Sequence, residues 1–288
     1  MIATAPVRIE PLPVPAIREA GRPRSLRVLH VAASLGRGGM ETALLRQLGF
    51  WSRACPADEH GLVILGRSDP DAVQAGGAVR TWSLGAAGRS WRGAWPLPRN
   101  IRAVRPDVVH ARTTGTWLDA VLATRGMSGT RLLLGFHGRE QLDEPAWLRR
   151  GLLGCAVRRA DAVVTLSQDS ADWIGRLWRL PAGRIEVIHN GVDLERFRPP
   201  DADRPARQRR ALLGGRERFL VLCVANLVPI KGLEILLEAW RRVRMIVPDA
   251  RLVIAGEGPQ RERLTAARTA LRLEAGVTLL GLRSDVPQ

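Results

Sequence analysis

The chain has 288 residues, of which 45% are hydrophobic and 25% are charged, and its formal net charge is +16. This apolar content is enough to build a sizeable buried core, which excludes an intrinsically disordered protein. No run of about 18 apolar residues occurs, which excludes an ordinary membrane-spanning helix. The three cysteines are far apart and form no Cys-x-x-Cys pair, so neither a zinc site nor a disulfide framework is indicated and a cytoplasmic setting is favoured.

Three explanations of the basic excess stay open: a solvated surface, attraction to an anionic membrane, and nucleic-acid binding. Lys231 is the only lysine, and the arginines are spread along the chain instead of forming one block. Such uniform use of arginine, together with the absence of tyrosine, is typical of a genome-wide codon bias. We therefore favour the solvated surface and expect no nucleic-acid partner. Residues 147–159, WLRRGLLGCAVRR, indicate peripheral membrane contact, or alternatively a helix packed on a sheet.

The chain begins with residues 1–25, which are rich in proline and arginine and lack the apolar stretch of a signal peptide, so we expect a disordered tail. From 26 to 198, short apolar runs alternate with helical-period segments. The first helix places Met40, Leu44, Leu48 and Trp51 on one face. Near-continuous apolar strands separated by helices indicate a doubly wound parallel sheet. The predicted strands are 27–34, 61–66, 107–111, 131–136, 162–166 and 185–189.

Residues 199–218 concentrate proline, arginine and small residues, as a linker does. From 219 to 288 the strand and helix pattern starts again. We predict a second Rossmann-like domain here, and a cleft between the facing carboxyl ends of the strands of the two domains. This second domain ends after about three strands and is expected to be incomplete. Its predicted strands are 219–226, 251–256 and 276–281, with helices at 232–247 and 261–273.

The segment GRGGME, Gly36 to Glu41, lies directly after the first strand and opens the first helix. Glycines at a helix N-terminus let backbone N–H groups approach an anion, so Gly38 and Gly39 are candidates for phosphate binding. The spacing is not the G-x-G-x-x-G dinucleotide fingerprint. A tight turn that needs positive φ is the alternative.

Lys231 stands at the start of a helix after a strand, in a chain that otherwise uses arginine. A compact ammonium suits phosphate oxygens where a guanidinium fork does not, although chance retention is the alternative. The segment AGEGP, 255–259, repeats the strand, glycine and helix pattern, and its Gly256 and Gly258 are weaker candidates for a nucleotide pocket.

His137 follows the fourth predicted strand and could donate a hydrogen bond to a sugar hydroxyl or a leaving phosphate, or serve a structural role. His110 and His30 are interpreted as structural, His30 in the core. HNGVD, 189–193, is a turn signal. No Ser-His-Asp order, P-loop or metal-ligand cluster occurs in the sequence, so no metal or cofactor is implied.

Several segments together resemble the retaining glycosyltransferases of family four. The resemblance covers nearly the whole chain from Leu26 to Gln288, and the order of the segments makes it specific. It is carried by HVAASLGRGGMETALLRQL, PDVVHART, the FHG turn, RADAVVTLSQDSADWI, LPAGRIEVIHNGVDLERFRP, VANLVPIKGLEILLEAW and LVIAGEGPQRERL.

The resemblance implies a GT-B fold of two Rossmann-like domains, the first on the acceptor side and the second on the donor side. Gly38 and Gly39 would lie under the donor diphosphate, and Lys231 would neutralise the leaving nucleotide diphosphate. His137 would lie near the donor sugar. Gly256 and Gly258 would border the nucleotide.

The chain departs from the family pattern in two features, one at a single position and one in a motif. Asn226 stands where many relatives carry an arginine that clamps the diphosphate, although some relatives also carry Asn. The Glu-x7-Glu motif that holds the donor sugar is missing, because no two glutamates stand eight positions apart. We interpret the gap as truncation of the second domain.

The sequence therefore predicts a retaining glycosyltransferase that moves a sugar from a nucleotide-sugar donor to a glycan or lipid-linked acceptor, without a metal. The expected setting is exopolysaccharide or glycolipid synthesis in the cytoplasm, either free or at the inner face of the membrane. The alternative is a catalytically inactive remnant that binds nucleotide or sugar. For the 288-residue chain itself we expect feeble nucleotide binding and little turnover.

Overall fold

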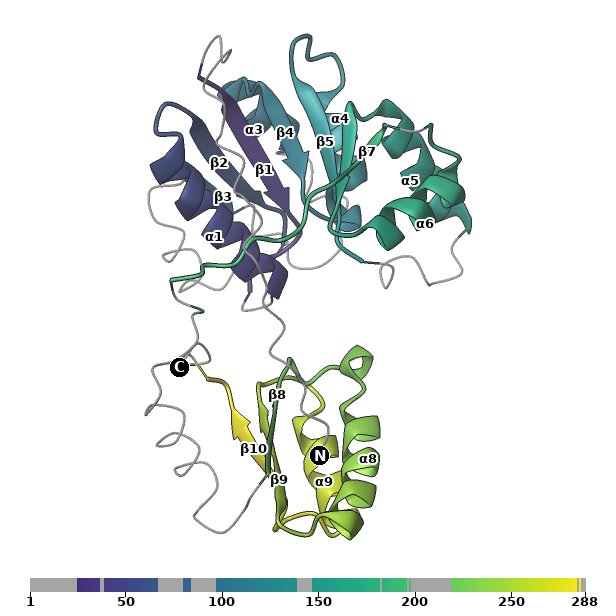
Figure 1. Ribbon diagram of the computed structural model, residues 1–288. Helices are drawn as coiled ribbons and strands as arrows, with labels where there is room; N and C mark the ends of the chain where they lie inside the picture. Colours follow the sequence, from purple (N-terminus) through teal and green to yellow (C-terminus); the bar gives the residue numbers. More distant parts are fainter. Residues whose placement is uncertain are drawn as a thin grey trace. The chain divides into compact units, whose positions relative to one another are not determined.

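The computed structural model describes residues 25–36, 39–66, 80–83, 97–138, 147–181, 183–195, 197, 219–283 and 285. The chain divides into two compact units, Met1–Asn190 and Gly191–Gln288. Nearly all of the predicted tail, and the predicted linker 199–218, lie outside the described residues, so the domain limits at 198 and 219 stay predictions. Each unit is described separately below (Figure 1).

Unit 1 contains a seven-stranded sheet in the order β3-β2-β1-β4-β5-β6-β7 (Figure 1). All six pairs of neighbouring strands are parallel. The strand order changes direction between β1 and β4, which is the doubly wound arrangement that the apolar runs predict. The strands are β1 Arg27–Ala32, β2 Glu59–Ile64, β3 Arg80–Ser83, β4 Val108–Ala111, β5 Arg131–Phe136, β6 Ala162–Thr165 and β7 Ile185–Val187.

The six predicted strands of unit 1 are confirmed, and β3 is an addition. Its four residues, RTWS, contain no apolar run, so nothing in the local sequence distinguishes them from a loop. They become a strand because the backbone of β2 offers parallel pairing from Gly61 to Ile64. The sheet edge therefore depends on a partner strand and not on local propensity.

The helices of unit 1 follow their strands as βα units. In α1, Leu44 and Leu48 are buried and Trp51 is half-buried, which confirms the predicted apolar face. The N-terminus of α6 is capped by Ser167, whose Oγ accepts a hydrogen bond from the Ser170 backbone N–H at 3.2 Å. The helices are α1 Gly39–Ala54, α3 Leu97–Val104, α4 Trp117–Thr124, α5 Trp147–Arg159 and α6 Gln168–Trp178, with a 3-10 turn η2 at Thr114–Thr116.

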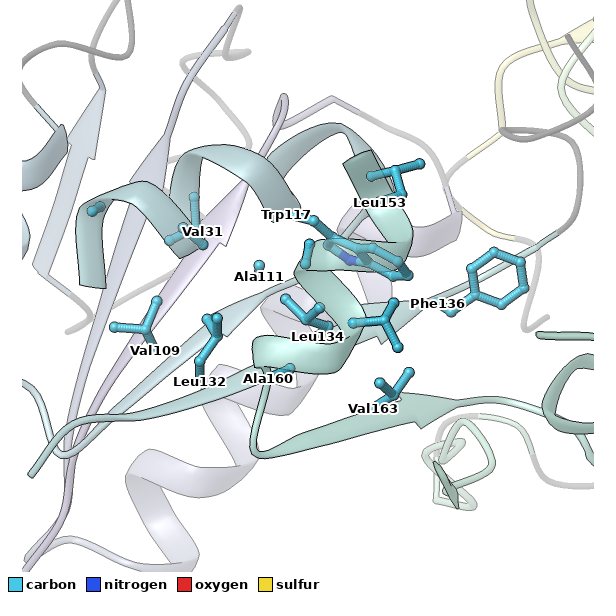
Figure 2. Close-up of a cluster of buried hydrophobic side chains, with 14 of the residues drawn as sticks. Val31, Val109, Ala111, Trp117, Leu132, Leu134, Phe136, Leu153, Ala160 and Val163 are labelled. Atoms are coloured by element: carbon cyan, nitrogen blue, oxygen red, sulfur yellow. The ribbon is translucent and has the colours of Figure 1, made fainter. Parts of the chain in front are cut away.

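The larger apolar core of unit 1 joins the sheet to α4, α5 and α6. Figure 2 shows Trp117 of α4 beside Leu153 of α5, above strand residues such as Leu134 and Val163. The Trp117 indole keeps a polar partner in this core, since its Nε1–H donates to the Gly135 carbonyl at 3.1 Å. A second, smaller core lies between α1 and strands β1 and β2, where Leu44 and Leu48 meet Leu62 and Ile64.

The sequence left two interpretations of residues 147–159, peripheral membrane contact or a helix packed on the sheet, and these residues form α5. Leu153, Ala156 and Val157 are buried in the larger core. The interpretation as a helix packed on the sheet is therefore confirmed. The opposite face of α5, which includes Trp147 and Leu152, is exposed.

Unit 2 contains a three-stranded parallel sheet in the order β10-β9-β8 within the described residues. Figure 1 shows α8 and α9 beside this sheet, and the two helices contact each other. Leu233, Leu237 and Trp240 of α8 are buried in the core of unit 2, whereas Val243 of the same helix is exposed. The elements are β8 Phe219–Val224, η4 Pro229–Lys231, α8 Leu233–Ile246, β9 Ala250–Ala255, α9 Arg261–Ala270 and β10 Val277–Gly281.

Candidate functional site

The candidate phosphate loop of unit 1 lies at the carboxyl end of β1. Gly36 is four residues past the strand and Gly39 is the first residue of α1. Gly38 lies outside the described residues. Neither Gly36 nor Gly39 has a positive φ, and open space surrounds the Cβ position of each. The positive-φ turn is therefore not the reason for glycine at these two positions, and phosphate binding by Gly39 stays a prediction.

His137 is the first residue after β5 and is half-buried at the carboxyl end of the sheet. Its location is the one that the sequence predicts. Burial, and to a lesser degree the charge of Arg112, lower the pKa of His137 to about 4. The imidazole is therefore neutral at pH 7, with one nitrogen that donates and one that accepts a hydrogen bond.

His30 and His110 are buried in neighbouring strands and pair in register. For both, burial is the largest cause of a pKa held well below 6.5, followed by the charge of Arg112. The core assignment of His30 is confirmed, and its ring stacks against Trp51 of α1 at 5.6 Å. Nε2 of His110 and Nδ1 of His30 are both buried without a hydrogen-bond partner among the described residues.

A glycine on β5 brings His110 and His137 together. A Cβ added to Gly135 would lie 3.2 Å from Nε2 of His110 and 3.3 Å from Nε2 of His137. It would also lie 3.0 Å from the backbone carbonyl oxygen of Arg112. The two imidazole nitrogens therefore converge over a position where any other residue would place a side chain.

In unit 2 the predicted residues lie at the carboxyl ends of β8 and β9. Asn226 follows β8 and is exposed. Lys231 is the last residue of η4 and is also exposed, one residue before the glycine that precedes α8. Its backbone N–H bonds the Val228 carbonyl at 3.0 Å, so the local turn fixes where the side chain starts. This placement leaves the ammonium open to solvent and to a ligand.

Gly256 and Gly258 follow β9 and pass against the backbone that follows β8. A Cβ on Gly256 would lie 1.9 Å from the Ala225 carbonyl oxygen, and one on Gly258 would lie 2.5 Å from that of Leu227. Leu227 also bonds the Glu257 carbonyl through its N–H at 2.9 Å. Both glycines are thus required by close backbone packing. This packing brings Gly256 and Gly258 beside Asn226, whatever role they have toward a nucleotide.

Sequence reasoning missed three residues around His137, namely Arg112, Gln47 and Gly135. Arg112 is buried and its Nη2 donates to Gln47 Oε1 of α1 at 2.8 Å. A signal for Arg112 existed in the segment DVVHART, where His110 and Arg112 alternate with apolar residues along β4 and just past its end. Alternation places both polar residues on one face of the sheet.

Within the described part of the chain, no group of three or more His, Cys, Asp or Glu side chains is arranged to hold a metal ion. No described helix is long and apolar enough to cross a membrane.

The two units match two family models. Residues 27–196 match the model of Glycosyltransferase Family 4, and residues 206–288 match that of Glycosyl transferases group 1. The chain belongs to glycosyltransferase family 4. This family 4 chain is 34% identical over half of its length to a GDP-mannose-dependent alpha-(1-6)-phosphatidylinositol monomannoside mannosyltransferase of Mycobacterium tuberculosis. It is 29% identical over 70% of its length to a glycogen synthase of the same organism.

The chain spans 37% of the length of that mannosyltransferase and 48% of that of the glycogen synthase. Among solved structures it is similar to Anabaena Alr3699/HepE in complex with UDP, with a TM-score of 0.72 and 19% identity, over 91% of this chain and 71% of that one. It is also similar to WaaG, a glycosyltransferase involved in lipopolysaccharide biosynthesis, with a TM-score of 0.65 and 14% identity, over 90% and 71% of the two chains. The GT-B fold that the family resemblance implies is thus confirmed for this family 4 chain.

Proposed function

We propose that this protein is a retaining glycosyltransferase that moves a sugar from a nucleotide-sugar donor to a glycan or lipid-linked acceptor. The observation that supports it most is the match of both units, in order, to glycosyltransferase family models. The similar structure of Anabaena Alr3699/HepE holds UDP or UDP-glucose, and the similar mannosyltransferase is named for GDP-mannose. Retention of configuration rests on the family resemblance.

In this proposal Lys231 and Asn226 bind the donor diphosphate from unit 2. The exposed ammonium of Lys231 would offset the negative charge that develops as the nucleotide diphosphate leaves. Because a lysine supplies this charge, we also propose that transfer needs no metal. Gly256 and Gly258 would let the backbone approach the nucleotide, and Gly38 and Gly39 would do so for the diphosphate from unit 1.

From unit 1, His137 would bond a hydroxyl of the donor sugar or assist the leaving phosphate. A neutral imidazole suits this task because a sugar hydroxyl both donates and accepts hydrogen bonds. The pKa of about 4 keeps the ring in that form throughout the physiological range.

The alternative proposal is a protein that binds nucleotide or sugar without turnover. The missing Glu-x7-Glu pair favours it for these 288 residues. The two proposals differ in whether donor binding is followed by release of a nucleoside diphosphate.

The test incubates the chain with UDP-glucose, GDP-mannose and ADP-glucose and measures nucleoside diphosphate release and, by calorimetry, donor binding. Release that stays unchanged in EDTA supports the transferase. Binding without release supports the alternative, and neither binding nor release contradicts both. The 288-residue chain is expected to release little, and Lys231→Ala should lower whatever release it shows about 100-fold or more. Lys231→Arg should lower release as well, because a guanidinium does not reproduce a compact ammonium. Arg242→Ala, an exposed change on α8, is the matched control and should leave release unchanged.

We also propose that the protein works in the cytoplasm and contacts an anionic membrane through the outer face of α5. Trp147 is 80% exposed and Leu152 is 45% exposed, and Arg158 and Arg159 are exposed at the end of the same helix. Aromatic and apolar side chains beside arginines fit the boundary between head groups and acyl chains of a bilayer.

Sedimentation with vesicles tests this contact. The chain should bind vesicles containing anionic phosphatidylglycerol and not vesicles of phosphatidylcholine alone. Arg158→Glu with Arg159→Glu should reduce binding several-fold, whereas Arg102→Glu with Arg105→Glu, an equal charge change at exposed sites near α3, should not. Equal loss in both variants would show that net charge alone drives the attraction.

A further inference from the structure

The imidazole of His110 lies near the carboxyl end of β4, and only 7% of the residue is exposed. Its two ring nitrogens have different surroundings. Nδ1 lies 3.5 Å from Nη1 of Arg112, whereas Nε2 is buried and has no hydrogen-bond partner among the described residues. A buried polar atom that lacks a partner costs free energy and is rare in native proteins. The unpaired nitrogen of His110 therefore calls for an explanation.

Arg112 determines which nitrogen of His110 carries the proton. Burial, followed by the charge of Arg112, holds the pKa of His110 well below 6.5, so the ring is neutral at pH 7 and has a single N–H. A guanidinium donates hydrogen bonds and cannot accept them, so Nδ1, the nitrogen beside it, must offer its lone pair. The proton is then on Nε2. The unpaired atom of His110 is thus an N–H donor that lacks an acceptor.

Arg112 is itself held by two other elements of unit 1. Its Nη2 donates to Oε1 of Gln47 on α1 at 2.8 Å, and its backbone N–H donates to the Val31 carbonyl of β1 at 2.9 Å. Only 4% of Arg112 is exposed, so solvent does not compete for the guanidinium. The direction of this side chain, and with it the position of the His110 proton, is therefore set by the fold.

The unpaired N–H of His110 lies beside His137 of the candidate site. A Cβ added to Gly135 would lie 3.2 Å from Nε2 of His110 and 3.3 Å from Nε2 of His137. The same Cβ would lie 3.0 Å from the Arg112 carbonyl oxygen. An N–H donor close to a carbonyl acceptor suits a group that both accepts and donates, which is the property of a hydroxyl. An anion would be repelled by the carbonyl oxygen, and a cation by the N–H.

We propose that His110 is a second ligand-binding histidine of the candidate site: its Nε2–H donates to the donor-sugar hydroxyl that His137 contacts, and Arg112 positions this proton. The sugar as ligand rests on the proposed function, whereas the position of the proton does not. His137 is only half-buried, so the hydroxyl reaches His110 from the side of His137. His30 is buried in register with His110 but has another partner, because its Nε2 lies 3.3 Å from Nδ1 of His60.

The first test locates the proton by nitrogen-15 NMR of the histidine rings in the 288-residue chain at pH 7.5, without ligand. The His110 signals are assigned through their loss in His110→Gln. Nε2 should carry the proton in the unaltered chain. In Arg112→Met the ring should become a mixture of both tautomers, because nothing then donates to Nδ1. Arg53→Met, an equal charge change at an exposed position of α1, should leave the tautomer unchanged.

A proton on Nδ1 in the unaltered chain overturns the proposal, and this result stands even if Arg112→Met does not fold. A tautomer that Arg112→Met leaves unchanged overturns it as well. A merely structural role of Arg112 would lower stability without moving the proton.

The second test adds UDP-glucose or GDP-mannose, with UDP alone as the control, and follows the same Nε2 signal. The nucleotide sugars should shift this signal and UDP should not, because the contact is with a sugar hydroxyl. By calorimetry, His110→Leu should weaken nucleotide-sugar binding about three- to tenfold, the effect of one hydrogen bond, and leave UDP binding unchanged. Gly135→Ala fills the space between the two rings and should have the same selective effect.

A signal that no nucleotide sugar shifts overturns the ligand contact, and so does equal weakening of UDP and nucleotide-sugar binding in His110→Leu. Nucleotide-sugar binding that depends on His110 but is not followed by release of nucleoside diphosphate supports the contact and contradicts only the proposed transfer. The two failures are therefore distinguishable.

Discussion

At position 256, the backbone packing of unit 2 requires a residue without a side chain. The loop after β9 bonds the loop after β8 through backbone groups, including the Leu227 N–H to the Glu257 carbonyl at 2.9 Å. Only a residue without a Cβ lets the two backbone segments approach this closely. The same packing places Asn226 beside the glycines, so one residue type serves the stability of unit 2 and the geometry of the candidate nucleotide site.

Gly256→Ala should therefore destabilise unit 2. The added Cβ would fall 1.9 Å from the Ala225 carbonyl oxygen, which belongs to the backbone and cannot rotate away. We expect a loss of about 2–4 kcal/mol in the free energy of unfolding, measured by urea titration. Glu274→Ala changes an exposed residue of the same unit and should stay within about 0.5 kcal/mol of the unaltered chain. Equal stability of the two variants would contradict the backbone contact.

At the scale of elements, α5 and α6 approach each other closely at Gly154. A Cβ there would lie 2.9 Å from Cδ1 of Trp178, and the Trp178 indole is fixed because its Nε1–H donates to the Arg150 carbonyl at 3.1 Å. Trp178 in turn packs on Trp117 of α4 at 5.8 Å. Gly154 thus permits three helices to share one aromatic core.

Gly154→Ala and Gly151→Ala form a matched pair on α5. At Gly151 the Cβ position is open, so alanine should stabilise the helix by about 0.5–1 kcal/mol through its higher helix propensity. At Gly154 the same change forces the Trp178 ring to move and should destabilise unit 1 by about 1–3 kcal/mol. Thermal unfolding of the two variants checks the opposite signs. If both variants are stabilised, α5 and α6 are not in the contact described.

At the scale of the whole molecule, three buried or half-buried histidines tie the stability of unit 1 to pH. The pKa of His137 is about 4, and those of His30 and His110 lie well below 6.5. Between about pH 4 and 6.5 the unfolded chain binds protons that the folded chain does not. Falling pH therefore favours the unfolded state, and the stability is fully present only above the unfolded pKa.

The free energy of unfolding should be higher at pH 7.5 than at pH 5, with a slope of about 1.4 kcal/mol per pH unit for each histidine that protonates only on unfolding. Urea titrations at pH 5, 6, 7 and 7.5 measure the slope. His137→Gln should reduce the slope between pH 5 and 6 by about 1.4 kcal/mol per pH unit, which is the contribution of one proton. A stability that does not change over this range would contradict the buried neutral histidines.

The sequence by itself determined the order of strands and helices, because apolar period and glycine breaks are local features of a chain. It also determined the family, through ordered motifs that run the length of both units, and it located His137 and Lys231 at strand and helix ends. It did not reveal β3, whose four residues form a strand only beside β2.

Only the tertiary structure decided what surrounds these residues. Gln47 and Arg112 are 65 positions apart and meet because parallel pairing sets β4 beside β1, beneath α1. The role of Gly135 also depends on the tertiary structure, because its missing Cβ leaves space for two imidazoles that come from neighbouring strands. Contacts across a sheet depend on register and burial, which no local pattern encodes. The candidate residues at strand and helix ends could therefore be predicted from the sequence, whereas the buried Arg112 and its contact with Gln47 could not.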